Sequence, residues 1–292
     1  MHQISPVMPV KNPWPTPRSA TPVLQSTSYE TYEHSKLIYL IVTELMSPSQ
    51  KPKAKATPKA KTTWRIPTRP PNSPFTGRNA LGAYIASPSK YPAVIYQNEQ
   101  FVAIYDGFPK SSVHVLLLPR DTSKTLLHPF EAFEDSQFLE AVKVEARKLK
   151  TLVASELRRK YGKHSAAEQV RIQAMGADPP PETLPRGRDW EKEVLVGVHA
   201  GPSMNHLHVH VLSVDRFSER LKHRKHYNSF STPFFIDVED LPLRADDVRR
   251  DPGGQHYLSR DFVCWRCGKN LGNRFSDLKA HLAEEFEQWK QE

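Results

Sequence analysis

The sequence predicts an α+β fold, in which an antiparallel sheet and one long helix form a domain that continues into a small C-terminal module. Short apolar runs separated by polar turn residues predict the strands. A stretch with apolar residues at helical spacing, from about Phe130 to Tyr161, predicts the long helix. A close pair of cysteines followed by a second helical pattern marks the C-terminal module.

Along the chain, we expect a hairpin and a third strand first, then the long helix, and then three further strands. A short helix is expected between Asn79 and Ala86, and Gln97–Gln100 supplies the polar residues of a hairpin turn. The expected strands are Ala93–Tyr96, Phe101–Tyr105, Val113–Leu118, Val194–Val198, Leu207–Val214 and Phe234–Val238. The apolar face of the long helix consists of Phe138, Leu139, Val142, Ala146, Leu149, Val153 and Leu157.

Composition divides the chain into three regions. Residues 1–76 are rich in proline and lysine and contain no glycine, which predicts a disordered tail. Residues 77–240 form the predicted domain, and within it the proline-rich residues 162–189 are expected to be an exposed insertion. Residues 241–292 comprise a linker and the small module.

The net charge of +9 is concentrated in the tail. Residues 1–76 contain ten Lys or Arg and three Glu, so only +2 remains for residues 77–292. An argument for nucleic-acid binding therefore needs local basic clusters. The lysine-rich segment Lys51–Lys61 is a nuclear address, a non-specific phosphate contact or a solvated linker, and its composition does not choose among them.

The chain carries no pattern of a membrane or secreted protein. Its two cysteines are too few for a disulfide scaffold and favour a reducing compartment. The most apolar run, Leu37–Val42, is far shorter than the ~20 residues that span a bilayer. It also lacks the basic start and the cleavage site of a convincing signal peptide.

The clearest chemical pattern is His206-Leu-His208-Val-His210, in which three imidazoles alternate with aliphatic residues. Alternate side chains of a strand share one face, so the three histidines are expected to line one surface. They could transfer protons, attack phosphorus as a nucleophile or bind a metal ion. The preceding GPSMN segment offers amide, hydroxyl and backbone donors rather than the carboxylates that support a histidine metal site, which favours a phosphate ligand.

The C-terminal module has the spacing of a zinc finger. Cys264-Trp-Arg-Cys267 is followed by His281 on a predicted helix, Ser276 to Trp289, for which Ser276 is the expected N-cap. No second histidine follows, and Glu285 stands one helical turn beyond His281. We therefore expect Cys264, Cys267, His281 and Glu285 to hold a structural zinc ion, with Glu284 as the competing ligand and a redox pair as the alternative.

The histidine pattern resembles the histidine-triad (HIT) family of nucleotide hydrolases and transferases, whose motif alternates histidine with apolar residues. The resemblance implies a HIT fold and an adenosine nucleotide substrate. It also implies that the middle imidazole, here His208, attacks the α-phosphorus to form a covalent nucleotidyl-histidine, while His206 and His210 hold phosphate oxygens or orient the nucleophile.

A HIT domain followed by a Cys-Cys-His-Glu finger resembles, more narrowly, the aprataxin family and in particular its fungal members. The resemblance covers about Arg78 to Trp289, without the insertion. The segments that carry it are RNALGAYIASP, DGFPKSSVH, VGVHAGPSMNHLHVHVLS, LKHRKHYNSFSTPFF and CWRCGKNLGNRFSDLKAHLAEEFEQW.

This resemblance implies a DNA 5′-adenosine monophosphate hydrolase that removes AMP from abortive-ligation ends during repair of DNA strand breaks such as single-strand breaks, in the nucleus. His208 would be the nucleophile, His199 the acid that protonates the departing DNA 5′-phosphate, and His210 a phosphate support. Asp106 would bind the ribose and Phe108 the base, and Lys110, Ser203 and Met204 would lie at the phosphates and the lesion entrance. No catalytic metal is required.

The expected DNA contacts are local. The basic segment Arg216–Lys225 could follow the phosphates, with Tyr227 as a stacking aromatic. Because Gly77 stands where the family would place an aromatic wedge, Leu81 or Phe75 would have to wedge the terminal base pair. The full set expected to contact nucleic acid is Leu81, Lys110, Lys222, Lys225, Tyr227, Ser229, Trp265 and Arg266.

Two other functions remain open on the sequence alone. One is a hydrolase of small nucleoside phosphoramidates or dinucleotides, and the other is a DNA-binding scaffold with an idle triad. The finger, the basic segment and the pairing of His208 with His199 favour the DNA hydrolase, acting as a monomer on nicked or broken duplex DNA. Protein partners, activity on RNA-primed or 3′-blocked ends and oligomeric state are not readable from the sequence.

Overall fold

The structure is a computed structural model that describes residues 76–292, which belong to one compact unit. The expectations for the tail, for Leu37–Val42 and for Phe75 lie outside these residues. Within residues 76–292, no helix is both long enough and apolar enough to cross a bilayer. The extents expected for the domain and the finger remain predictions.

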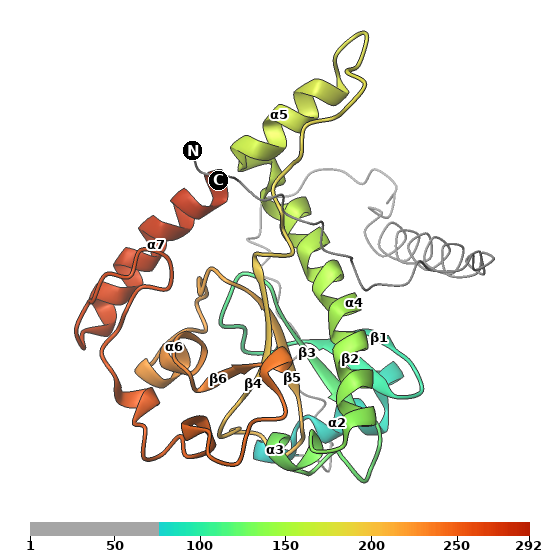
Figure 1. The fold of residues 1–292 in the computed structure, drawn as a ribbon, viewed down its shortest axis with the longest axis vertical. Coiled ribbons are helices and arrows are strands. Elements are labelled where there is room, and N and C mark those ends of the chain that lie inside the picture. The colour runs from blue at the N-terminus through green and yellow to red at the C-terminus, as the bar shows by residue number, and fades with distance from the viewer. Residues whose placement is uncertain (1–75) are drawn as a thin grey trace, which may run out of the picture. The chain divides into compact units, whose positions relative to one another are not determined.

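A six-stranded antiparallel sheet forms the centre of the fold, in the order β1-β2-β3-β5-β4-β6 (Figure 1). Its strands are β1 Val94–Gln97, β2 Phe101–Tyr105, β3 His114–Pro119, β4 Val194–His199, β5 Val209–Ser213 and β6 Phe235–Asp237. In β5, His210 pairs with Leu116 of β3 and with Gly197 of β4. Position 197 requires glycine, because a Cβ there would lie 2.3 Å from the carbonyl oxygen of Ile236.

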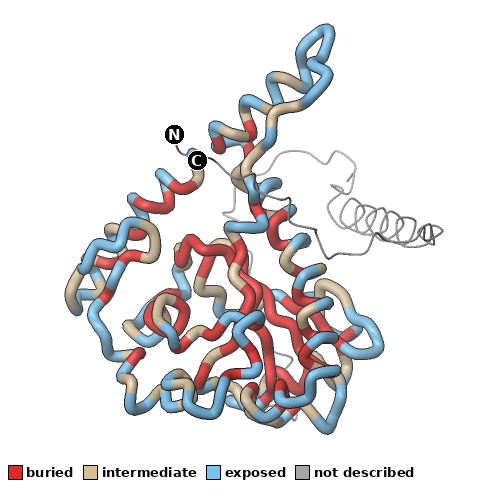
Figure 2. Tube along the Cα trace, in the orientation of Figure 1, coloured by how far each residue is buried: buried red, intermediate tan, exposed pale blue. Residues whose placement is uncertain are grey.

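One face of the sheet is covered by the long helix α4, Ser136–Tyr161 (Figures 1 and 2). Asp135 is its N-cap and accepts hydrogen bonds from the backbone N–H groups of Gln137 and Phe138, which satisfies two donors of the first turn. The buried residues of α4 join the sheet in the main core. The expected α+β architecture, an antiparallel sheet covered by one long helix, is thereby confirmed.

The remaining helices are short, apart from the last. The other α-helices are α2 Gly82–Ala86, α3 Pro129–Ala132, α5 Ala166–Met175, α6 Arg224–Ser231 and α7 Phe275–Gln291. The 3₁₀ turns are η1 Gly77–Asn79, η2 Pro88–Lys90, η3 Gly162–His164, η4 Val238–Asp240, η5 Val248–Arg250 and η6 Tyr257–Ser259.

Two expectations about elements are wrong. Strand β5 begins at Val209 rather than at Leu207, so His206 and His208 lie in the segment before it and only His210 of the three lies on the strand. Helix α7 begins at Phe275 after Arg274, which makes no side-chain cap, so Ser276 lies inside the helix and is not its N-cap.

The insertion is only partly exposed. It forms α5, which projects from the body of the domain, yet Ser165 is fully buried and Glu168 is 2% exposed (Figures 1 and 2). Glu168 accepts hydrogen bonds from Arg158 and from the Trp190 indole. The sequence did not indicate that Ser165 and Glu168 are buried. Both residues are polar, and hydrogen bonds rather than apolar packing accompany their burial.

Candidate active site and metal centre

A cavity of about 330 Å³ opens beside the histidine segment. Its walls come from the start of the chain's described part, from β2 and the loop after it, from the end of β4, and from α6. It contains most of the residues expected to bind a nucleotide or to act on it: Asp106, Phe108, Lys110, His199, Ser203, Met204, His208 and His210. Leu81, Tyr84, Ile104 and Leu116 give it an apolar side.

His208 is held in one tautomer. Its Nδ1 lies 2.7 Å from the carbonyl oxygen of His206, and a carbonyl can only accept, so Nδ1 carries the proton. The lone pair is therefore on Nε2. The ring is 6% exposed and lines the cavity, so this nitrogen is available to a ligand there. His206 contributes its backbone to this arrangement.

A fourth histidine, His114 at the start of β3, supports the triad. The backbone N–H of Lys110 donates to His114 Nδ1 at 3.1 Å, which assigns the proton to Nε2. That Nε2 lies 3.0 Å from His210 Nδ1, so the proton of His210 is in turn on Nε2. His210 thus offers an N–H donor that has no partner within residues 76–292. The sequence analysis did not predict a role for His114. Its position as a polar first residue of an otherwise apolar strand could have indicated one.

His199 closes the cluster at the end of β4. Its ring centroid lies 4.5 Å from that of His210, and its buried Nε2 has no hydrogen-bond partner among the described residues. Phe230 of α6 packs edge-on against both rings, at 4.6 Å from His199 and 5.0 Å from His210. Two imidazole nitrogens without a partner among the described residues, on His199 and His210, therefore lie close to the lone pair of His208 at the cavity.

Burial keeps these histidines neutral. Desolvation lowers the pKa of His208, and it lowers the pKa values of His199 and His210 to well below the usual 6.5. The pKa of His114 falls to about 4 for the same reason, although Asp106 opposes the shift. Neutral imidazole at pH 7 is the form that acts as a nucleophile.

The loop after β2 presents Asp106 and Lys110 to the cavity. Asp106 Oδ1 accepts the Phe108 N–H at 2.7 Å, and Oδ2 lies 3.4 Å from His114 Nδ1. Lys110 Nζ donates to the Phe108 carbonyl, and burial lowers the pKa of this lysine. Phe108 is 59% exposed at the mouth of the cavity, where Arg220 lies 5.7 Å from its ring centroid.

His114 and His210 belong to a hydrogen-bonded chain that begins at the Lys110 N–H. Ligand atoms of Asp106, His114 and His210 lie within 4.8 Å of one another. However, His114 turns Nδ1 toward Asp106 and Nε2 toward His210, so the three do not point at one position. Within residues 76–292, the set His206, His208 and His210 does not form a group that could hold a metal ion.

Several residues expected to contact DNA are occupied elsewhere. Leu81 is 7% exposed and packs in an apolar cluster with Val102 and Leu116, so it is not available as a wedge. Tyr227 is fully buried, and its hydroxyl donates to the Val263 carbonyl and accepts the Trp265 N–H, so it cannot stack on a base.

Lys222, Lys225 and Ser229 of this set differ in exposure. Lys222 and Lys225 are exposed, whereas Ser229 lines the cavity. Arg216 is buried, and Arg224 donates to the carbonyl oxygens of Ser259 and Asn273, which ties α6 to the finger. The basic segment is therefore partly a domain joint.

The four expected zinc ligands come together. Cys264 and Cys267 lie on a turn, His281 and Glu285 lie on α7, and their ligand atoms are within 4.8 Å of one another. Cys267 Sγ and Glu285 Oε1 each lie 3.2 Å from His281 Nε2, which suits a tetrahedral ion with bonds of ~2.0–2.3 Å. The donor set therefore fits a structural zinc ion.

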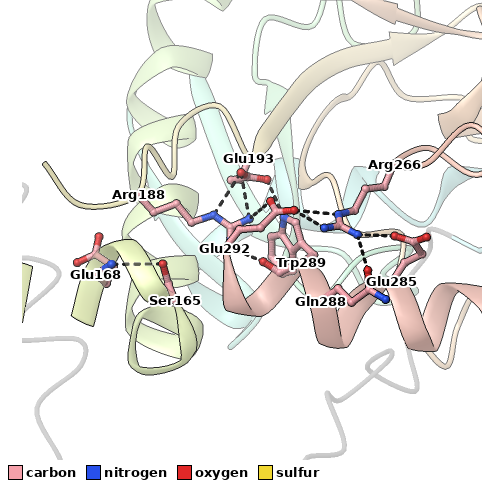
Figure 3. A network of polar contacts seen from close by, with 9 residues as sticks. All are labelled: Ser165, Glu168, Arg188, Glu193, Arg266, Glu285, Gln288, Trp289 and Glu292. Carbon is pink, nitrogen blue, oxygen red and sulfur yellow. Dashed lines mark hydrogen bonds and ion pairs between the residues drawn. The ribbon is translucent and has the colours of Figure 1, made fainter. Parts of the chain in front are cut away.

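Arg266 belongs to the support of this centre. It donates to Glu285 Oε2 at 2.6 Å, to Gln288 on the same helix and to Glu292 directly after the helix (Figure 3). Because the guanidinium is engaged with α7, it is not free to contact a nucleic acid as expected from the sequence. It orients the carboxylate ligand instead.

Comparisons with known proteins agree with both parts of the site. Residues 87–217 match the HIT domain family, and residues 231–288 match the C2HE/C2H2/C2HC zinc-binding finger family. An aprataxin-like protein of Schizosaccharomyces pombe is 34% identical over 218 residues, which cover 73% of this chain and 82% of the relative. An aprataxin-like protein of Saccharomyces cerevisiae is 36% identical over 217 residues, which cover 72% and 95%.

Solved structures show the same similarity. The crystal structure of the aprataxin ortholog Hnt3 in complex with DNA aligns with a TM-score of 0.59 at 34% identity, over 73% of this chain and 96% of that one. A structure of Hnt3 in complex with DNA and guanosine aligns with a TM-score of 0.56 at 33% identity, over 73% and 96%.

Proposed function

Because the chain belongs to the aprataxin-like family of HIT hydrolases with a C-terminal zinc finger, we propose that it is a DNA 5′-adenosine monophosphate hydrolase. Its substrate is the adenylated 5′ end that abortive ligation leaves at a nick or break in duplex DNA. The DNA complexes solved for its relative Hnt3 support a DNA substrate.

The observation that carries the proposal is the tautomer of His208. The 2.7 Å hydrogen bond from Nδ1 to the His206 carbonyl leaves the Nε2 lone pair available in the cavity. Burial keeps the ring neutral. A neutral imidazole with a free nitrogen, together with the unpaired N–H group of His210, is equipped for nucleophilic attack on a phosphate.

In the first step, His208 Nε2 attacks the α-phosphorus of the adenylate. A P–N bond forms to the histidine, and the P–O bond to the DNA 5′-phosphate breaks, so that the bonding electrons leave with the DNA phosphate. The N–H group at His210 Nε2 stabilises the negative charge on the α-phosphate oxygens.

His199 carries the proton for the departing phosphate oxygen. Burial keeps it neutral in the free protein, and the negative phosphates of a bound substrate raise its pKa so that Nε2 is protonated when the bond breaks. In the second step, water attacks phosphorus, gives its proton to His199 and breaks the P–N bond, which releases AMP and restores His208. The protein's own residues supply each of these groups, so we propose no catalytic metal.

We propose that AMP occupies the cavity, whose lining is suited to each of its parts. The apolar side formed by Leu81, Tyr84, Ile104 and Leu116 suits the base, with Phe108 at the mouth. Asp106 is placed to accept hydrogen bonds from the ribose hydroxyls, and Lys110, Ser203 and Met204 lie around the phosphates and the entrance.

The DNA lies on the side of the exposed lysines Lys222 and Lys225, with Ser229 at the cavity and the finger beyond them. These cations neutralise backbone phosphates, which gives salt-dependent binding. Trp265 is partly buried and acts mainly within the joint between finger and domain. We further propose that the protein works as a nuclear monomer in the repair of DNA strand breaks.

The experiment that tests the proposal measures AMP release from a nicked duplex with an adenylated 5′ end. The parent is expected to release AMP, His208→Ala to release none, and the exposed control His164→Ala to match the parent. Lys222→Ala with Lys225→Ala should weaken DNA binding at moderate salt. If the parent hydrolyses adenosine 5′-phosphoramidate but leaves adenylated DNA intact, the site is a small-molecule nucleotide hydrolase and the proposal is wrong.

A further inference from the structure

A buried arginine links the zinc finger to the catalytic histidines. Arg216, 7% exposed, follows β5 with φ of 45°, a conformation that residues other than glycine seldom adopt. Its Nη1 donates to the Val214 carbonyl at 2.5 Å and its Nη2 to the Phe230 carbonyl at 2.7 Å. Within residues 76–292 it forms no ion pair. A buried charge on a strained backbone persists only where its surroundings hold it in place.

The bond to Phe230 places the arginine at the C-terminal turn of α6. Carbonyl groups there lack partners within the helix, and a cation is favourable at that end of the helix dipole. Arg216 therefore fixes the turn that carries Phe230. The Phe230 ring in turn contacts three histidines, at 4.6 Å from His199, 5.0 Å from His210 and 5.4 Å from His114.

The finger covers the other side of the guanidinium. The Trp265 ring, between the two cysteine ligands, lies 5.7 Å from Arg216, which compensates part of the lost hydration of the cation. Trp265 is held in register because its backbone N–H donates to the Tyr227 hydroxyl at 3.0 Å, and that hydroxyl donates to Val263 at 2.9 Å. Finger, arginine and α6 thus form one continuous set of contacts.

We propose that Arg216, covered by Trp265, is a positioning residue through which the finger holds Phe230 against His199 and His210. The finger then supports the chemical step itself, in addition to any contact with DNA. The inference rests on the proposed function only in taking these histidines as catalytic.

The two histidines respond to this packing through solvent. His199 and His210 face each other and are flanked by His114, His208 and Lys110, and burial is the largest cause of their low pKa values. If Phe230 loses its support, water reaches the rings and their pKa values rise toward 6.5. If a variant only reduced the fraction of folded protein, the titration midpoints of the molecules that remain folded would not change.

The test uses adenosine 5′-phosphoramidate, whose leaving group is too small to reach the finger. Arg216→Asn keeps a residue that tolerates positive φ but removes the guanidinium, and Trp265→Leu keeps an apolar side chain but removes the aromatic ring that covers the guanidinium. Arg244→Asn, which loses an exposed ion pair with Asp246, is the matched control. Active sites are counted by the covalent AMP formed in the first turnover, and the histidine ring resonances are titrated by NMR in the free protein.

For Arg216→Asn we expect kcat per active site to fall about tenfold, KM to stay within about twofold, and the titration midpoints of His199 and His210 to rise. Trp265→Leu should give the same pattern with smaller amplitude, and Arg244→Asn should match the parent. Unchanged kcat per site and unchanged midpoints in both variants would overturn the inference. The NMR titration tests the role of Arg216 even if the parent is inactive on either substrate. A parent that is inactive only on adenylated DNA would contradict the proposed function but not this inference.

Discussion

At the scale of residues, reactivity in this site follows from how protons are distributed over four buried rings. The Lys110 N–H sets the tautomer of His114, and His114 sets that of His210. A carbonyl sets the tautomer of His208 independently. The result is one lone pair opposite one N–H donor, which is the arrangement that nucleophilic attack on a phosphate requires.

Removing the ring of His114 should impair catalysis without removing a group that we place on the substrate. In His114→Phe, His210 loses the donor that fixes its tautomer, so we expect kcat for adenosine 5′-phosphoramidate to fall about 10- to 100-fold. The measurement is steady-state AMP release, compared with the exposed variant His164→Phe. A His114→Phe protein with the parent's kcat would show that the chain of hydrogen bonds is not needed.

The acid limit of catalysis should lie below that of an ordinary histidine. In the proposed mechanism, formation of the AMP–His208 bond needs neutral His208, whose pKa burial lowers from 6.5. We therefore expect kcat/KM to remain high at pH 6.5 and to fall only at lower pH. An AMP p-nitrophenyl ester isolates this step, because p-nitrophenolate leaves without a proton. A midpoint at or above pH 6.5 would contradict the assigned environment of His208.

At the scale of elements, the insertion is part of the support for the finger helix. The Arg188 guanidinium lies 4.6 Å from the ring centroid of Trp190 and 4.8 Å from that of Trp289. It donates to the Trp289 carbonyl (Figure 3). It also pairs with Glu193, one residue before β4, which accepts the Trp289 indole N–H. Insertion, sheet and α7 therefore share one polar network.

Breaking this network should destabilise the protein. The Arg188 side chain is 6% exposed, so Arg188→Met leaves Glu193 without its buried partner, and we expect a loss of about 2–4 kcal/mol in unfolding free energy. Lys192→Met, which loses an exposed pair with Asp189, should change stability by less than about 0.5 kcal/mol. Urea unfolding measures both variants, and equal effects would mean that the network contributes nothing specific.

At the scale of the whole molecule, the buried histidines couple stability to pH. Their pKa values are lower in the folded state than in the unfolded chain, so below pH 6.5 the unfolded chain binds more protons. Stability is therefore complete above pH 6.5 and declines as the pH falls toward about 4, the pKa of His114. Asp215, whose pKa burial raises, opposes this decline only at the acid end.

The expected decline is measurable by urea unfolding between pH 7.5 and pH 5. Each histidine that stays neutral in the folded state removes up to ~1.4 kcal/mol per pH unit below its unfolded pKa. The steepest fall should therefore come below pH 6.5. Stability that is constant or increasing over this interval would show that the four rings are not buried in their neutral form.

The sequence by itself determined the features whose signal is local. Alternation of His206, His208 and His210 indicated the candidate active site, helical spacing predicted α4, and the cysteine, histidine and glutamate spacing predicted the metal centre. The helical patterns are legible because periodicity in a helix fixes which side chains share a face, whereas only His210 of the three histidines lies on β5. The fold class and the family followed from them.

Tertiary structure decided which polar residues lie in the candidate active site and which bind neighbouring elements instead. His114 enters the histidine cluster, whereas Tyr227, Arg216 and Arg266 are drawn into the joint around the finger. A basic or aromatic residue reads the same in the sequence whether it faces solvent or a neighbouring element. Only the packing of segments far apart in the chain settles its partner, because burial obliges each polar group to find one.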